Sequence, residues 1–160
     1  IMYLFNVDDN ALTDESMQKT LRDSVSPAPA VFVCAKLEDE LRGLDEQDRF
    51  DMLESYGVSE AGLDKVIHAA YDLLGLQSYL TAGVQEVRAW TIHKGWTAPQ
   101  AAGVIHGDFE KGFIAASIVN YDDLVAAGSE QAAKAAGKMR TEGKTYIMQD
   151  GDVVEFKFNN

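Results

Sequence analysis

The 160-residue sequence has one cysteine, three prolines and no long apolar run. The single cysteine, Cys34, excludes a disulfide framework within the chain and favours a reducing compartment. No stretch approaches the roughly 20 apolar residues that a membrane-spanning helix needs, so no membrane partner is expected. The chain opens on an apolar run without a basic flank, which does not resemble a secretory signal. We expect this chain to be a piece of a longer protein.

Basic residues are scarce as well. The chain has 14 Lys and Arg against 26 Asp and Glu, for a net charge of −12. Residues 1–76 hold 16 acidic and 6 basic side chains (−10), whereas residues 77–160 hold 10 and 8 (−2). Because a strongly negative surface repels phosphate backbones, DNA is not an expected partner.

The first part of the chain predicts an α/β arrangement. Ile1–Phe5 and Ala30–Cys34 are apolar runs typical of strands buried on both faces of a parallel sheet. Between them, Thr13 is expected to cap a helix whose buried face carries Met17 and Leu21. A strand, a helix and a strand at this spacing form a βαβ unit.

Two more helices are predicted before residue 76. Asp45 is expected to cap the first, which carries Phe50, and Ser59 the second, which ends at Gly75. Apolar residues recur at helical spacing in the second: Leu63, Val66, Ile67, Ala70, Tyr71 and Leu74. Because two strands and three helices cannot close a core of their own, residues 1–75 are expected to need another partner.

The second part reads as a small α+β module of the β-grasp type. Thr97 and Gln100 form a capping box at the start of a helix, which is followed by a polar loop at 106–112. Another helix is expected from Ser129. The expected strands are Ser78–Thr81 and Glu86–Ile92 as a hairpin, Ile114–Val119, and Thr145–Met148 with Val153–Phe158 as a second hairpin turning at Asp150-Gly151.

Polar motifs follow both strands of the βαβ unit. Asn6-x-x-Asp9 comes after the first strand, and Cys34-Ala35-Lys36 after the second. Ligands of open α/β sheets bind at the carboxyl ends of the strands. An Asn amide both donates and accepts at a purine edge, whereas an Asp carboxylate only accepts. The two motifs therefore favour a nucleotide-base site, with polar loops that merely turn the chain as the alternative.

Longer runs of the sequence resemble the YchF/Obg-like ATPase family. They cover nearly the whole chain: YLFNVDD, VFVCAKLEDEL, GLDKVIHAAYDLLGLQSY, TAGVQEVRAWTI, TAPQAAGVIH, DFEKGFI, AGKMRTEGKTYI and QDGDVVEFKFN. The resemblance implies that residues 1–76 are the C-terminal part of a P-loop nucleotide-binding domain of the OBG type, incomplete here. It further implies that residues 77–160 are a TGS domain, which has the ubiquitin-like β-grasp fold.

The resemblance also implies a function. The family binds and hydrolyses ATP, and GTP less well, with Mg²⁺, and it associates with ribosomes in the cytoplasm. This chain has no Gly-x-x-x-x-Gly-Lys-Ser/Thr loop, so alone it is expected to hold no cofactor and to be inactive. The N-terminal half of the nucleotide domain is then a required partner. A non-catalytic TGS-type module that binds RNA or the ribosome is the alternative.

By this resemblance the base contacts come from Asn6, Val7 and Asp9 in the first loop. The second loop supplies Cys34, Ala35 and Lys36. Asp9 stands where the family usually has Glu, and the second loop is closer to the Ser-Ala-Lys of GTPases than is usual in the family. Both departures favour guanine, whereas Val7 in place of the GTPase Lys favours the family's adenine.

Contacts with ribosomal RNA are expected from the second part. Trp96 is the candidate for stacking on a base. The candidates for phosphate contacts are Lys94, Lys111, Lys138, Arg140 and Lys144, with a solvated face as the alternative. His106 lies near Asp108 and Glu110, but the spacing matches no standard metal site. We therefore predict no metal site and a bracing hydrogen bond for His106.

Overall fold

The computed structural model describes residues 1–83 and 86–159. The chain divides into two compact units, Ile1–Leu74 (unit 1) and Gly75–Asn160 (unit 2), and each is described by itself. Within the described residues, no helix combines the length and apolar character needed to cross a membrane.

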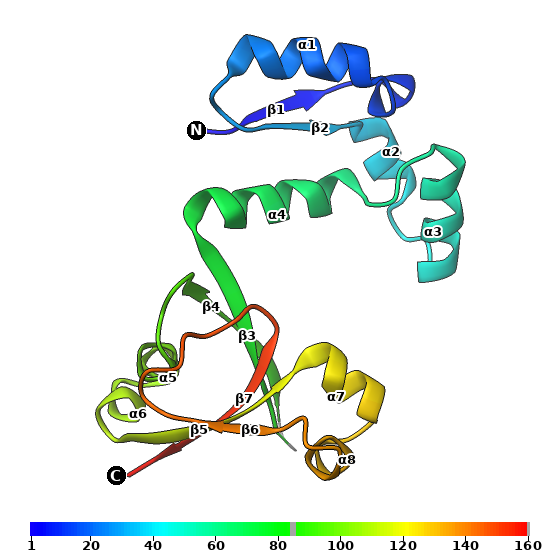
Figure 1. Ribbon diagram of the computed structural model, residues 1–160. Coiled ribbons are helices and arrows are strands. Elements are labelled where there is room, and N and C mark those ends of the chain that lie inside the picture. The colour runs from blue at the N-terminus through cyan, green and yellow to red at the C-terminus, as the bar shows by residue number, and fades with distance from the viewer. Residues whose placement is uncertain (84–85, 160) are drawn as a thin grey trace. The chain divides into compact units, whose positions relative to one another are not determined.

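Unit 1 contains the predicted βαβ arrangement (Figure 1). Its two strands pair in parallel, from Tyr3 opposite Ala30 to Asn6 opposite Val33. Helices α1 and α4 both contact β2 and lie on opposite sides of the two strands. The elements are β1 (Tyr3–Asn6), the 3-10 helix η1 (Asp9–Leu12), α1 (Glu15–Val25), β2 (Ala30–Val33), α2 (Ala35–Glu40), α3 (Glu46–Ser55) and α4 (Gly62–Leu74).

Of the three capping residues predicted for the helices of unit 1, one is confirmed. Asp45 caps α3, as predicted, by accepting from the Asp48 N–H at 2.9 Å. At α1 the cap is Asp14 rather than Thr13, with its carboxylate accepting from the Met17 N–H at 3.0 Å. A carboxylate at this position also interacts favourably with the positive end of the helix dipole, whereas an uncharged hydroxyl does not. Ser59 does not cap α4, which begins only at Gly62.

The segment after Cys34, predicted as a loop, is the short helix α2. Leu37 and Leu41 are one helical turn apart, and both are buried. They pack in one cluster with Cys34, Leu53 and Ala61. Burial of this i, i+4 pair favours the helix over an open loop.

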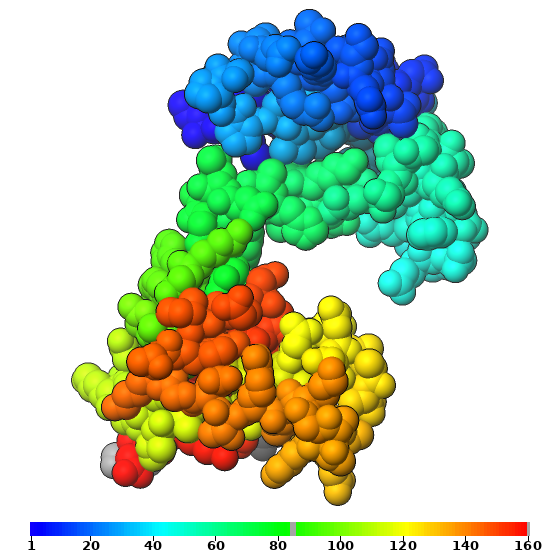
Figure 2. Space-filling model, in the orientation of Figure 1, coloured from blue at the N-terminus to red at the C-terminus, as the bar shows by residue number. Residues whose placement is uncertain are grey.

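Much of the apolar surface of unit 1 stays exposed. Leu4 in β1 is 53% exposed, so β1 is not buried on both faces as predicted. Phe50 and Leu63 are each 60% exposed, and Met17, expected in the core, is exposed too. In Figure 2 the green α4 segment is open to the viewer. Within unit 1, no described element covers these side chains, whereas a complete doubly wound sheet has helices over both of its faces.

Unit 2 is built on one five-stranded mixed sheet in the order β4-β3-β7-β5-β6. The predicted hairpin of β3 and β4 is confirmed, and its connection at residues 84–85 lies outside the described residues. β7 pairs with β5 in antiparallel and with β3 in parallel fashion. The elements are β3 (Leu76–Ala82), β4 (Val87–His93), α5 (Ala98–Ile105), α6 (Gly107–Lys111), β5 (Phe113–Asn120), α7 (Tyr121–Ala127), α8 (Glu130–Ala135), β6 (Arg140–Glu142) and β7 (Asp152–Phe158).

The core of unit 2 lies on both faces of this sheet. Tyr79, Ile118 and Val154 pack against α5, where the Tyr79 hydroxyl donates to the Ala101 carbonyl at 2.9 Å. Val119 and Ala133 form a smaller cluster with α7 and α8. The predicted capping box at α5 forms through Gln100, whose Oε1 accepts from the Thr97 N–H at 2.8 Å. Ser129 caps α8 as predicted.

Several predictions for unit 2 are wrong. Thr145–Met148 is not a strand: it makes a single isolated bridge, between Ile147 and Thr97. Asp150-Gly151 therefore turns the chain into β7 without joining two paired strands. The predicted polar loop at 106–112 contains the five-residue helix α6. Both β6 and α7 were missed because three residues and seven residues are too short for a clear periodic pattern.

Candidate functional site

The two strand-end motifs meet at one edge of the parallel pair. The side-chain Oδ1 of Asn6 accepts a hydrogen bond from the Ala35 N–H at 3.0 Å. Asn6 ends β1, and Ala35 begins α2 directly after β2 and Cys34. The hydrogen bond joins segments 29 residues apart and holds the two strand ends together.

The rest of the first loop is held by its own backbone. The Val7 N–H donates to the Val33 carbonyl at 2.8 Å, which extends the β1–β2 pairing by one residue. Asp9 lies in the first turn of η1, where its Oδ1 accepts from the Asn10 N–H at 2.8 Å. Both side chains are half-buried. The loop is therefore ordered by local contacts.

In the second loop, Cys34 is buried and acts through its backbone. Its carbonyl accepts from the Glu38 N–H at 3.0 Å, closing the first turn of α2. Lys36 is exposed, with its Nζ 3.8 Å from Glu40 Oε1. Only Ala35 of this loop is joined directly to the first motif, through the Asn6 side chain.

A charged network adjoins the site. The Tyr56 hydroxyl donates to Glu40 Oε2 at 3.3 Å. The nearby Glu40 carboxylate raises the pKa of Tyr56, desolvation adds to this, and Asp9 contributes in the same direction.

Glu38 is a site residue that the sequence analysis missed. Its carboxylate accepts from the N–H groups of Gly62 and Leu63, which open α4. The available signal was the lack of a capping side chain directly before Gly62, where Ala61 stands. A helix start without a local cap calls for an acceptor from elsewhere in the chain.

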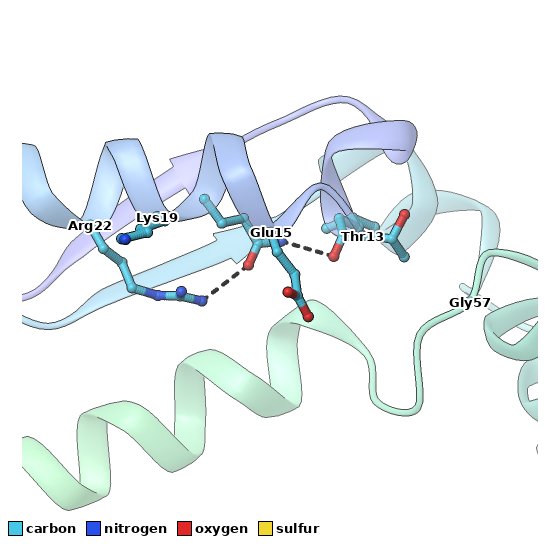
Figure 3. A pocket seen from close by; sticks show the side chains of 7 residues that line it. Thr13, Glu15, Lys19, Arg22 and Gly57 are labelled. Carbon is cyan, nitrogen blue, oxygen red and sulfur yellow. Dashed lines mark hydrogen bonds between the residues drawn. The ribbon is translucent and has the colours of Figure 1, made fainter.

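A hollow of about 610 Å³ lies along α1, away from the strand-end motifs (Figure 3). Thr13, Glu15, Lys19, Arg22 and Gly57 are among the residues that line it. The Gln18 amide, which also lines the hollow, donates to the Leu12 carbonyl at 2.8 Å and accepts from Arg22 Nη2 at 3.1 Å. Because these groups already bond to one another, the hollow is a weaker candidate than the strand-end loops.

In unit 2, two of the predicted phosphate contacts form ion pairs with other residues. Lys138 Nζ lies 3.1 Å from Asp123 Oδ1. Arg140 Nη2 lies 4.0 Å from the buried carboxylate of Asp152 and 3.3 Å from the Tyr146 hydroxyl, to which it donates. These contacts favour a structural role for Arg140.

Of the remaining candidates, Trp96 is half-buried against the core, and its ring centroid is 5.3 Å from that of His93. The side chains of Lys94, Lys111 and Lys144 are exposed. The bracing hydrogen bond predicted for His106 is confirmed, because its Nδ1 accepts from the Asp108 N–H at 3.2 Å.

Comparison with known proteins identifies the family. Residues 76–159, just over half of the chain, match the family model YchF-GTPase_C, described as a protein of unknown function (DUF933). The chain belongs to the YchF family. This match confirms the resemblance found in the sequence.

The ribosome-binding ATPase YchF of Bacillus subtilis is 48% identical over 164 residues, covering 99% of this chain and 45% of that protein. Obg-like ATPase 1 of Rattus norvegicus is 52% identical over 123 residues, covering 77% of this chain and 31% of that protein. The structure of the Schizosaccharomyces pombe YchF GTPase aligns with a TM-score of 0.78 and 37% identity over 98% of this chain and 43% of that one. The chain thus spans less than half the length of these relatives.

Proposed function

We propose that this chain is the C-terminal part of a YchF-type P-loop ATPase that works with ribosomes in the cytoplasm. In this proposal residues 1–76 carry the base-recognition loops of the nucleotide domain, and residues 77–160 form a TGS domain with the β-grasp fold. The observation that carries it is the hydrogen bond from Ala35 to Asn6, which joins the two strand-end loops in a chain of this family. The names of its relatives, ribosome-binding ATPases, supply the activity.

The base site follows from the chemistry of these loops. With its oxygen bonded to Ala35, Asn6 keeps two amide N–H donors for an acceptor on the purine ring. The backbone of Val7 and the Ala35–Lys36 segment border the base, and Cys34 supports this segment from the core. Asp9 is the discriminating group, since its carboxylate suits guanine N–H donors, whereas the family background favours adenine.

The phosphate chemistry belongs to the rest of the protein. The sequence contains no Gly-x-x-x-x-Gly-Lys-Ser/Thr loop. Among residues 1–83 and 86–159, no group of three or more His, Cys, Asp or Glu side chains could hold a metal. ATP and Mg²⁺ are therefore bound by the complete protein, and this polypeptide alone does not turn ATP over.

The N-terminal half of the nucleotide domain is the partner that unit 1 requires. A largely apolar hollow of about 650 Å³ lies beside α2 and α4, with Leu4, Val33, Leu41 and Leu63 in its wall. Further strands of the same sheet and their helices would cover this surface.

Binding to the ribosome is assigned to unit 2, with Trp96 and the exposed Lys94, Lys111 and Lys144 as the RNA contacts. Lys138 and Arg140 each pair with an acid of unit 2, so RNA phosphates would compete with Asp123 and Asp152 for them. The second candidate function, a binding module without turnover, is favoured by the separate core of unit 2. Detectable ATP hydrolysis by residues 1–160 alone would contradict both candidates, whereas a complete protein that neither binds nor hydrolyses ATP would leave only the binding module.

The test of the base site is ATP affinity in the complete protein. Asn6→Ala removes both the donors to the base and the tie to Ala35, so the Kd for ATP should rise about tenfold or more, the effect of losing one to two hydrogen bonds. Gln47→Ala is the matched control, because it removes an exposed amide that bonds Asp51 within α3. Equal affinities for the two variants would contradict the proposal.

A further inference from the structure

Glu38 belongs to neither strand-end motif, yet its carboxylate joins two helices. Its Oε1 accepts from the Gly62 N–H at 2.6 Å, and its Oε2 accepts from the Leu63 N–H at 3.3 Å. These are the first two N–H groups of α4, which have no partner within their own helix. The negative charge of a carboxylate there also interacts favourably with the positive end of the helix dipole. Glu38 therefore caps α4 across 24 residues of sequence.

The junction between Glu38 and α4 has no spare room. A Cβ added at Gly62 would stand 2.9 Å from Glu38 Oε1 and 2.9 Å from Val33 Cγ1. Such distances require a shift of β2 or of the Glu38 side chain. Glycine at position 62 is what lets α4 approach β2 and α2 together, so the position of α4 is coupled to that of α2.

The same short helix carries the base-loop contact. Ala35 begins α2 and donates to Asn6, and Glu38 lies one turn further along. Leu37 and Leu41 fix α2 in the core of unit 1. Because Ala35 and Glu38 share this one helix, a shift of α2 relative to α4 would displace Ala35, and with it the Asn6 side chain.

We propose that Glu38 is a positioning residue for nucleotide binding. It holds α2 against α4 so that the Ala35 N–H orients Asn6, and it thereby couples the base loops to the last helix of unit 1. This inference rests on the proposed function, because the loops that Glu38 positions are the proposed base site. Glu38 itself touches no ligand.

The test compares three variants of the complete protein. Glu38→Gln weakens the acceptor, and Gly62→Ala disturbs the same contact from α4 while keeping the carboxylate. Each should raise the KM for ATP about fivefold or more, the usual range of coupling between sites, and leave kcat within about twofold, because the phosphate site lies elsewhere. Asp39→Asn, which changes an exposed acid on the same helix, should leave both constants unchanged.

Amide hydrogen exchange in the unsubstituted protein provides a second readout, which does not depend on any variant folding. ATP should slow exchange at Gly62 and Leu63 if the base loops and α4 are coupled. Exchange at these two amides that does not respond to ATP would overturn the inference. So would an unchanged KM in Glu38→Gln or Gly62→Ala while Asn6→Ala raises it. If Asn6→Ala also has no effect, the base site itself is wrong.

Discussion

Asp9 is the residue at which the choice between adenine and guanine is expected to be made. Its half-buried carboxylate accepts from the Asn10 N–H in the first turn of η1. An ionised carboxylate accepts hydrogen bonds but cannot donate them. It therefore binds the N–H groups of guanine and is unfavourable next to an acceptor atom of adenine.

Replacing Asp9 should therefore separate the two nucleotides. In Asp9→Asn the Kd for GTP should rise about tenfold or more through loss of a charge-assisted hydrogen bond, whereas the Kd for ATP should change by less than about twofold. Titration of the complete protein with each nucleotide measures both. Asp8→Asn, at the neighbouring exposed acid, is the control. Equal losses for ATP and GTP would show that Asp9 does not discriminate.

Tyr146 makes a contribution to the stability of unit 2 that is lost at alkaline pH. Burial, together with the hydrogen bond to Asp152, raises the pKa of Tyr146 to about 12 from an ordinary value near 10. Between these two values the unfolded chain loses the phenol proton and the folded chain keeps it. Stability contributed by this group is complete below pH 10 and is lost as the pH rises toward 12.

Tyr146→Phe should remove this part of the pH dependence. The free energy of unfolding in urea should fall less between pH 9 and pH 11 in the variant than in the unsubstituted protein. Tyr79, whose pKa burial also raises, contributes a slope that remains in both. Tyr121→Phe, at an exposed position, should unfold with the original slope. A slope unchanged by Tyr146→Phe would show that Tyr146 titrates alike in both states.

At the scale of elements, α6 meets the end of β7 at Gly112. The Gly112 N–H bonds the Asp108 carbonyl, and the Asn159 N–H bonds the Gly112 carbonyl, both at 2.9 Å. A Cβ at Gly112 would overlap the Asn159 carbonyl oxygen. Phe109 and Phe158 stack across the same junction, with ring centroids 3.7 Å apart.

Gly112→Ala should consequently destabilise unit 2 by about 1–3 kcal/mol, the usual cost of overpacking. Chemical denaturation followed by tryptophan fluorescence measures this directly. Gly107→Ala is the control, since a Cβ there meets nothing within 4 Å. Equal stabilities would mean that the chain end shifts away from position 112 at no cost.

Elements were predictable from the sequence where the signal was local. The β3–β4 hairpin and the Gln100 capping box follow from residues close together in the chain, and the parallel pair follows from the spacing of its βαβ unit. Prediction failed where a distant partner decided the structure. Glu38 sets the start of α4 from 24 residues away, and β7 pairs with β5 and β3 instead of with Thr145–Met148. The placement of Asn6 and Ala35 at neighbouring strand ends was predicted, but neither the helix that begins at Ala35 nor the hydrogen bond between the two residues was.

At the scale of the whole chain, the two units differ in how much they bury. Among the described residues, the main cluster of unit 2 holds ten buried residues, whereas that of unit 1 holds five. Unit 1 also exposes Leu4, Phe50 and Leu63. Because apolar burial is the main stabilising term, unit 1 by itself should be the less stable of the two.

The 160-residue chain should accordingly unfold in two steps. Both tryptophans, Trp90 and Trp96, lie in unit 2, so their fluorescence reports on unit 2 alone, whereas far-ultraviolet circular dichroism reports the helices of both units. The dichroism signal should begin to fall at a lower temperature than the fluorescence signal. Coincident curves would indicate a single cooperative transition and contradict the difference in stability.

The hydrogen bond between Asn6 and Ala35 has a thermodynamic consequence for any ligand of these loops. Folding of unit 1 has already fixed both segments, so association does not bear the entropy of ordering them. A site preorganised in this way should bind with a small change in heat capacity and without a slow conformational phase. In Asn6→Ala the two segments would become ordered only when the ligand binds, so the binding entropy would be less favourable.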